Sequence, residues 1–174
     1  MISNMITVEK LSPRLAGELK AARLAALQDT PTAFTGTYAR ESQLSNDEWL
    51  ARSSTWSSSR STCYIAMDQG VPCGLVAGKC DEQDLQRAHV LSMWVAPQYR
   101  RAGLGSRLMQ AVQSWAQDLG VRELHLLVTS PNATAKRFYE KCGFTPSGFV
   151  QPYPNDPALT ESGMVKYLAR RDPS

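Results

Sequence analysis

The chain has 174 residues, of which 43% are hydrophobic and 20% are charged, and its formal net charge is +3. This length suits one α/β domain and leaves too little for two comfortable domains. Because no lysine/arginine tract is interleaved with aromatic residues, and no apolar run approaches the roughly 18 residues of a membrane helix, neither nucleic acid nor a membrane is an expected partner.

The cysteines and the first residues indicate a reducing compartment. Residues 1–6 lack the charged start and apolar core of a signal peptide. The four cysteines form no C-x-x-C pair and lie inside apolar segments, so buried reduced thiols are expected; they are Cys63, Cys73, Cys80 and Cys142. We therefore predict a cytoplasmic protein without a metal site.

In the N-terminal half, apolar and polar residues alternate over 5–11, which predicts a strand. Ser12 and Pro13 offer a helix N-cap and first position, and the helix they begin is expected to end near Gln28. Residues 32–44 are interpreted as an irregular loop. A capping box at Ser45 predicts a second short helix, after which a hairpin of two strands is expected over 62–67 and 71–79.

The C-terminal half continues with an apolar strand, a glycine-containing turn and an amphipathic helix. A strand, a helix and two closing strands follow, the last two on either side of a proline-rich connection at 151–157. The expected ranges are 89–94, 104–119, 121–128, 131–142, 144–151 and 163–168.

The turn between the apolar strand and the helix has the features of a phosphate site. Gly103 and Gly105 let the backbone turn tightly and approach a ligand. The free N–H groups of the helix point into the turn, and Arg100, Arg101 and Arg107 add positive charge. No Asp or Glu occurs from Leu85 to Gln117. A ligand bearing phosphate is therefore predicted here.

The motif itself is neither a dinucleotide fingerprint nor a P-loop, since it lacks G-x-G-x-x-G and Gly-Lys-Ser/Thr. Arg100-x-x-Gly103-x-Gly105, preceded by Val95-x-Pro97, resembles the pyrophosphate loop of the GNAT superfamily of N-acetyltransferases. About thirty residues later, Asn132-x-x-Ala135-x-x-x-Tyr139-x-x-x-Gly143-Phe144 resembles the second signature of that superfamily. The order of the expected elements resembles its fold over nearly the whole chain.

The resemblance implies an α/β GNAT fold, with a central mixed, mostly antiparallel sheet flanked by helices. It implies that acetyl-CoA binds in the splay between the two central strands, and that residues 1–174 are a single N-acetyltransferase domain. The implied reaction moves the acetyl group of acetyl-CoA to a primary amine by direct attack, without a metal.

Carried over to this sequence, the resemblance assigns a set of cofactor-binding residues. The main-chain groups before the turn would hold the pantetheine arm and donate to the thioester carbonyl, and those of the turn would hold the phosphates. Asn132, at a helix start, would be an N-cap, a contact to the CoA arm, or both. The set comprises Met93, Trp94, Val95, Arg100, Arg101, Ala102, Gly103, Leu104, Gly105, Ser106 and Asn132.

Two residues are candidates for proton transfer. Tyr139, with an unperturbed pKa near about 10, can protonate a departing thiolate; the alternative is a tyrosine packed in the core. Family members often have a glutamate base on the strand ending at Val95, and this strand contains none. His89 is the candidate base, although a lone histidine on an apolar strand is more often structural. An amine with a lowered pKa could also lose its proton to water.

The acceptor is predicted from local charge alone. Acidic loops around Glu41, Glu48, Asp81, Asp84 and Asp156 favour a cationic small molecule, such as an aminoglycoside-type antibiotic inactivated by acetylation. The alternatives are a protein N-terminus or a lysine as acceptor, and a catalytically silent CoA-binding module. The oligomeric state is left open, with a homodimer as one option.

Overall fold

A computed structural model describes residues 5–172 of the chain. Its strands form one seven-stranded sheet in the order β1-β2-β3-β4-β5-β7-β6. All neighbouring strands are antiparallel except β4 and β5, which are parallel. The strands are β1 (Ile6–Lys10), β2 (Ser61–Asp68), β3 (Val71–Cys80), β4 (Arg87–Val95), β5 (Glu123–Thr129), β6 (Thr145–Tyr153) and β7 (Asp156–Tyr167).

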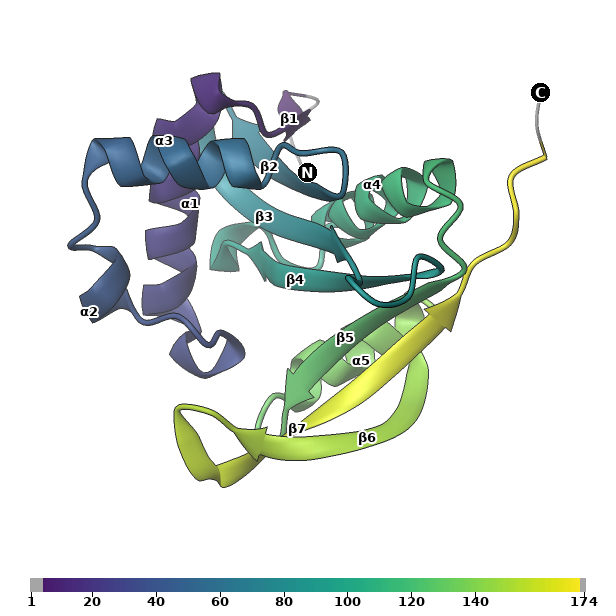
Figure 1. Cartoon of the computed structure of the whole chain (residues 1–174). Coiled ribbons are helices and arrows are strands. Elements are labelled where there is room, and N and C mark those ends of the chain that lie inside the picture. Colours follow the sequence, from purple (N-terminus) through teal and green to yellow (C-terminus); the bar gives the residue numbers. More distant parts are fainter. Residues whose placement is uncertain (1–4, 173–174) are drawn as a thin grey trace.

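Helices cover both faces of the sheet, as the sequence predicts (Figure 1). One face carries α1 (Ala16–Asp29), with α2 (Tyr38–Glu41) and α3 (Asn46–Thr55) beside it. The other face carries α4 (Leu104–Asp118) and α5 (Ala133–Lys141). Short 3-10 turns lie at Pro13–Leu15, Pro31–Ala33 and Pro97–Tyr99.

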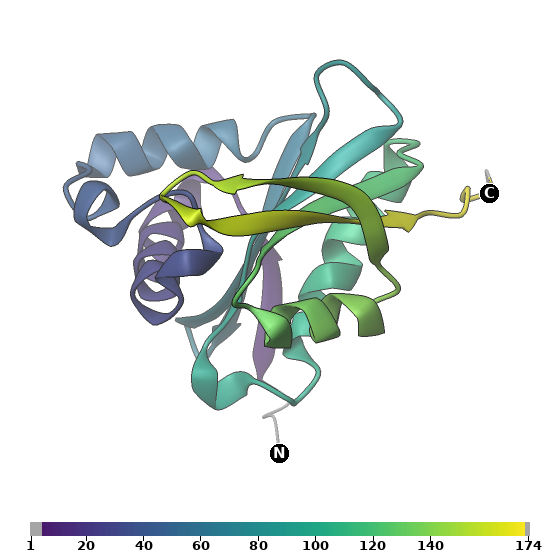
Figure 2. The same ribbon diagram turned by 90° about the horizontal axis from the view of Figure 1, so that it is seen from below.

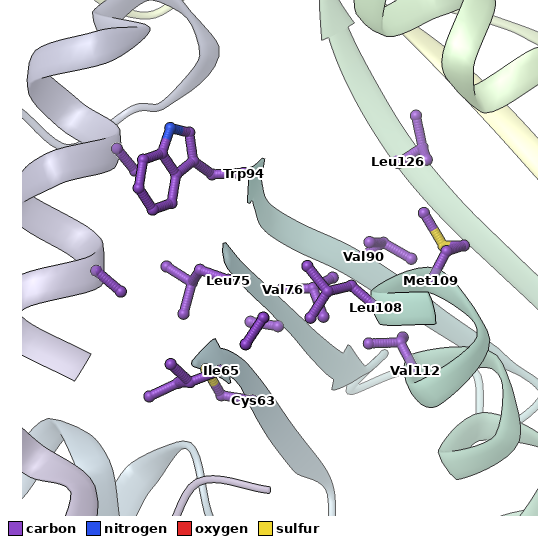
Figure 3. Close-up of a cluster of buried hydrophobic side chains, with 14 of the residues drawn as sticks. Cys63, Ile65, Leu75, Val76, Val90, Trp94, Leu108, Met109, Val112 and Leu126 are labelled. Atoms are coloured by element: carbon purple, nitrogen blue, oxygen red, sulfur yellow. The ribbon is translucent and has the colours of Figure 1, made fainter. Parts of the chain in front are cut away.

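The core is divided between the two faces of β3, because successive side chains of a strand point to opposite sides. Leu75 lies with Ile65 toward α1, and Val76 lies with Leu108 toward α4 (Figure 3). Glycine takes two of the positions that face α4. A Cβ on Gly78 would lie 2.8 Å from the Trp115 ring. These glycines let α4 pack directly against the backbone of β3.

Strands β4 and β5 separate soon after they meet (Figure 1). They pair only from Arg87 opposite Glu123 to His89 opposite His125. On its other side, β4 stays paired with β3 up to Val95, across a register shift. Ser92 lies in this irregular stretch with a φ of 56°. The second half of β4 therefore has an edge toward β5 that no strand of the described chain covers.

Three expectations are wrong in detail. Residues 32–44 are not wholly irregular, because Thr37 accepts a hydrogen bond from the backbone N–H of Arg40 and caps α2. The proline-rich segment belongs to the β6–β7 hairpin, so β7 begins seven residues before the expected start at 163. Pro152 is tolerated because β6 is an edge strand. Ser12 makes no capping hydrogen bond.

The tip of the β6–β7 hairpin is fixed to the segment between α1 and α2 (Figure 2). The Tyr153 hydroxyl donates to the Phe34 carbonyl, and the Asn155 amide donates to the Thr35 carbonyl at 2.9 Å. The hairpin and the α1–α2 segment therefore hold each other in place near the open end of β4 and β5. Within residues 5–172, no helix has the length and apolarity needed to span a membrane.

A matched pair of glycine substitutions tests the packing of α4. Gly78→Ala should lower the free energy of unfolding by about 1–3 kcal/mol, because its methyl group overlaps Trp115. Gly17→Ala, the same change at an exposed α1 position with no atom within 4 Å of the new Cβ, should raise it by up to about 1 kcal/mol. Urea denaturation measures both. A neutral Gly78→Ala would contradict the close approach.

Candidate active site

The second half of β4, which is paired with β3 but not with β5, leads into the glycine turn. This half is called the unpaired half of β4 below. The Trp94 indole N–H donates to an Asp29 oxygen at 3.0 Å, which attaches this end of β4 to the end of α1. The Val95 carbonyl accepts a hydrogen bond from the Arg100 side chain at 2.9 Å. Met93 lies on the opposite side, because a Cβ on Gly105 would come within 3.5 Å of its methyl group. The end of β4, where the cofactor is expected to bind, is therefore fixed on both faces of the sheet.

The turn presents free backbone N–H groups. Gly103 has a φ of 86°, a conformation that favours glycine, and α4 begins after it without a side-chain cap. Its first turn contains no acidic residue. The N–H of Arg107 bonds to the Gly103 carbonyl, so the N–H groups of Leu104, Gly105 and Ser106 precede the first intrahelical bond. This geometry suits an anion.

The three arginines expected at the turn differ in their partners. Arg100 contacts Asp29 and the Val95 carbonyl, and Arg107 donates to the Ile6 carbonyl at 3.1 Å. Arg101 has no hydrogen bond or ion pair to any of the residues that the structure describes. Only Arg101 is therefore free to use its whole guanidinium for a ligand.

Asn132 is a helix cap, as the sequence allows. Its side-chain oxygen accepts a hydrogen bond from the Ala135 N–H at 3.1 Å at the start of α5. Farther along the same helix, Phe138 lies against the glycine turn, since a Cβ on Gly105 would be 3.0 Å from its ring. Helix α5 therefore packs beside the start of α4.

Tyr139 is buried, and its ring packs near two other aromatic rings. The ring centroids of Phe138 and Phe144 lie 5.4 Å and 6.1 Å away. Burial raises the pKa of Tyr139 well above its ordinary value, and Cys142 adds to the effect. The phenol is protonated at neutral pH, and its raised pKa makes it a weaker acid than an exposed tyrosine. Its hydroxyl makes no hydrogen bond to the part of the chain that is described.

His89 lies in the paired half of β4, away from the open end. Its Nε2 is 2.9 Å from an Asp81 carboxylate oxygen, and this hydrogen bond is the main reason that the pKa of Asp81 is lowered. Met93 is four positions after His89, a distance of about 13 Å along a strand. Direct proton abstraction beside Met93 is not favoured by this position.

A buried ion-pair network on the α1 side was not foreseen from the sequence. Glu41 accepts two hydrogen bonds from Arg23 and one from Arg52, each at 3.0 Å. Arg23 also donates to the Ser92 hydroxyl at 2.8 Å. Burial raises the pKa of Glu41, but the two arginines outweigh it and hold that pKa below its usual range. The only sequence signal is a charged residue within the apolar pattern of α1.

The other carboxylates expected to bind a cation also have local partners. Glu48 accepts from the Ser45 N–H in the capping box. Asp81 and Asp84 accept from backbone N–H groups of their own loop, and Asp156 accepts from the N–H of Ala158. No cluster of these carboxylates gathers beside the open end of β4.

A family model described as "Acetyltransferase (GNAT) family" matches residues 24–144. The chain belongs to this family. The match includes the glycine turn and Tyr139, and the sheet and its flanking helices have the GNAT fold.

Among curated proteins, N-acetyltransferase family 8 member 7 of Mus musculus is 31% identical over 98 residues, which are 54% of this chain and 43% of the mouse protein. The chain thus matches under half the length of that relative. Among solved structures, a GNAT acetyltransferase of Streptococcus pneumoniae aligns with a TM-score of 0.78 and 24% identity, over 94% of this chain and 99% of that chain.

Two further structures bear on the ligands of such proteins. The structure of yncA, a putative acetyltransferase from Salmonella typhimurium, contains its cofactor acetyl-CoA; it aligns with a TM-score of 0.74 and 17% identity over 97% of both chains. Nourseothricin acetyltransferase aligns with a TM-score of 0.58 and 27% identity, over 62% of this chain and 65% of that chain.

The Glu41 network predicts a pH-dependent contribution to stability. Because the pKa of Glu41 is lowered on folding, its contribution is complete above about pH 4.5 and is lost as the pH falls through the folded value. Glu41→Gln should cost about 2 kcal/mol at pH 7, and its difference from the wild type should shrink below pH 4.5. Denaturant unfolding at pH 7 and pH 4 measures this.

The matched control is Glu82→Gln, since the Glu82 side chain is 82% exposed and pairs only with Lys79. It should change the free energy of unfolding by less than about 0.5 kcal/mol at either pH. A Glu41→Gln difference that is equal at pH 7 and pH 4 would show that the carboxylate charge is not what stabilises this region.

Proposed function

We propose that the protein transfers the acetyl group of acetyl-CoA to the primary amine of a small molecule by direct attack. The observation that carries the proposal is the uncovered edge of β4, which runs into an uncapped helix start with a free arginine. A chain in the acetyltransferase family with this geometry can hold an amide-bearing arm along the strand and phosphates at the turn.

In this proposal, the pantetheine arm pairs with the backbone of Met93, Trp94 and Val95. A backbone N–H of this stretch donates to the thioester carbonyl and stabilises the negative charge that develops on its oxygen. The phosphates bind the backbone N–H groups from Arg101 to Ser106. Asn132 contributes by fixing the start of α5, which packs beside this turn.

The amine nitrogen attacks the thioester carbon, a C–N bond forms and the C–S bond breaks. The departing thiolate takes the proton of the Tyr139 hydroxyl, the proton lost by the amine goes to solvent, and the Tyr139 phenolate takes a proton back from solvent before the next turnover. His89 is the alternative acceptor of that proton, through a chain of water molecules. Tyr139 is protonated at neutral pH, as a general acid must be, but burial raises its pKa and makes it a weaker acid than an exposed tyrosine, so the assignment rests on its place in α5 and not on its pKa.

The expected cationic antibiotic is supported by the likeness to nourseothricin acetyltransferase. It loses support from the carboxylates, because those expected to bind ammonium groups already have protein partners. We therefore propose a small-molecule amine as the class of acceptor and treat an aminoglycoside-type acceptor as the alternative. A protein N-terminus or lysine, or CoA binding without catalysis, would also appear as distinct outcomes of the assay below.

The test is release of free thiol from acetyl-CoA in the presence of a panel of amines and acceptor peptides. Tyr139→Phe should lower kcat by roughly 10²–10⁴, because the thiolate loses its proton donor, while the KM for acetyl-CoA should hardly change. Tyr167→Phe is the matched control, since that ring is 70% exposed on β7. Single-turnover rates exclude masking by product release.

A Tyr139→Phe protein with wild-type single-turnover rates would remove Tyr139 from the mechanism. Acetyl-CoA binding without thiol release from any acceptor would support the silent binding module instead.

Substitutions that remove single arginine charges test whether the glycine turn binds the phosphates. Arg101→Ala should weaken acetyl-CoA binding about tenfold and reduce its dependence on ionic strength, because one charge-assisted contact is lost. Arg107→Ala should have a smaller effect, since its guanidinium donates to Ile6. Arg14→Ala, an exposed arginine in another part of the fold, is the control. Calorimetry at two salt concentrations measures all three, and equal losses for Arg101 and Arg14 would contradict the site.

A further inference from the structure

A cavity of about 570 Å³ lies on the α1 side of the sheet, between α1, α2, α3 and the middle strands. Its volume is in the range of small-molecule sites. We call it the arginine pocket, because its charged lining consists of Arg23, Arg40, Arg52 and Glu41. Apolar side chains from α3 and β3 complete the wall, among them Trp49 and Leu75.

The arginine pocket carries an excess of positive charge. Its three arginines face one carboxylate, and both oxygens of Glu41 are already bound by Arg23 and Arg52. A Cβ on Gly36 would lie 2.0 Å from a Glu41 oxygen, so the backbone also packs closely against the carboxylate. Glu41 therefore has little capacity to bind a ligand cation, and the pocket favours an anion.

The arginines are not equally occupied. Arg23 is used by Glu41 and by Ser92. Arg52 makes one hydrogen bond to Glu41 and is 40% exposed, so other N–H groups of its guanidinium are free. Arg40 is exposed and has no ion pair or side-chain hydrogen bond within residues 5–172. A carboxylate matches the fork of N–H donors that such guanidinium groups present.

The arginine pocket also touches the strand where the reaction is proposed to occur. Ser92 lines the pocket, lies in the unpaired half of β4 and immediately precedes Met93. Its positive φ and the register shift beside it turn this stretch out of the regular ladder, and Arg23 holds its hydroxyl. A ligand anchored in the pocket is therefore next to the proposed thioester site.

We propose that the arginine pocket binds the acceptor and that the acceptor is a primary amine bearing a carboxylate, of the amino-acid class. This inference rests on the proposed function. The carboxylate would bind Arg40 and Arg52. The apolar body would lie against Leu44 and Trp56, which line the pocket and are partly exposed. The amine would then point toward β4. Polycations are disfavoured because the pocket arginines repel them.

The experiment compares each of the twenty common amino acids with its own α-carboxamide in the thiol-release assay. The amide keeps the amine and the side chain and removes the negative charge. Because it also lowers the pKa of the α-amine, kcat/KM is expressed per concentration of neutral amine. We expect the best amino acid to exceed its amide in kcat/KM by at least about tenfold. Kanamycin and spermidine are tested as polycationic acceptors in the same assay. Greater activity with the amides or the polycations would overturn the inference and leave the acetyltransferase intact.

Substitutions in the arginine pocket test whether the preference for acid over amide arises there. Arg40→Gln and Arg52→Gln should each reduce the preference for acid over amide, with thermal unfolding reporting that the proteins fold, and Arg14→Gln should leave the preference unchanged. A preference that neither pocket variant changes would overturn the inference.

Calorimetric titration of the amino acids into the CoA-bound protein separates binding from turnover. Binding that is weakened by Arg40→Gln, without thiol release, would support the pocket and count against the proposed reaction. Neither binding nor release with any amino acid would overturn the inference.

Discussion

The divergence of β4 from β5 is the constraint on which the site depends. The two strands pair over only three positions, and beyond them the backbone of β4 is left with unpaired groups on one side. Such an edge is costly to leave uncovered and attracts an extended ligand. The irregular stretch at Ser92 and the glycine turn after Val95 continue the same interruption. One departure from regular pairing thus produces both the strand edge and the approach to the helix start.

The arginines around this opening are divided between structural and free positions. Arg100 attaches the turn to Asp29, which also holds Trp94, so the charge at the end of α1 fixes the last residues of β4. Arg23 fixes Ser92 at the other end of the opening. Two arginines near the opening, Arg101 and Arg40, have no side-chain partner within residues 5–172 and lie beyond these anchored points. The arginines with protein partners therefore fix the shape of the site. The arginines without such partners are available to ligands at both of its ends.

The sequence predicted the order of strands and helices because hydrophobic period and glycine position are local signals. It also located the glycine turn and the cap at Asn132. It could not assign partners to charged side chains that are distant in sequence. Arg23 and Glu41 are 18 residues apart, Trp94 and Asp29 are 65 apart, and Arg107 reaches a carbonyl 101 residues away. Glu41 thus looked like a free acidic group, although folding pairs it with two arginines.

Tyr139 shows why a packed residue and a catalytic residue need not be alternatives. Its ring packs near Phe138 and Phe144, and Phe138 in turn lies against Gly105 at the start of α4. This packing fixes the ring relative to the turn and removes water from around it, and the resulting desolvation raises the pKa of the phenol. A proton donor for a leaving thiolate needs a fixed position and a proton that is not lost at neutral pH. Core packing supplies the fixed position, whereas the raised pKa makes the phenol a weaker proton donor than an exposed tyrosine, so the suitability of Tyr139 rests on its position and not on its acidity.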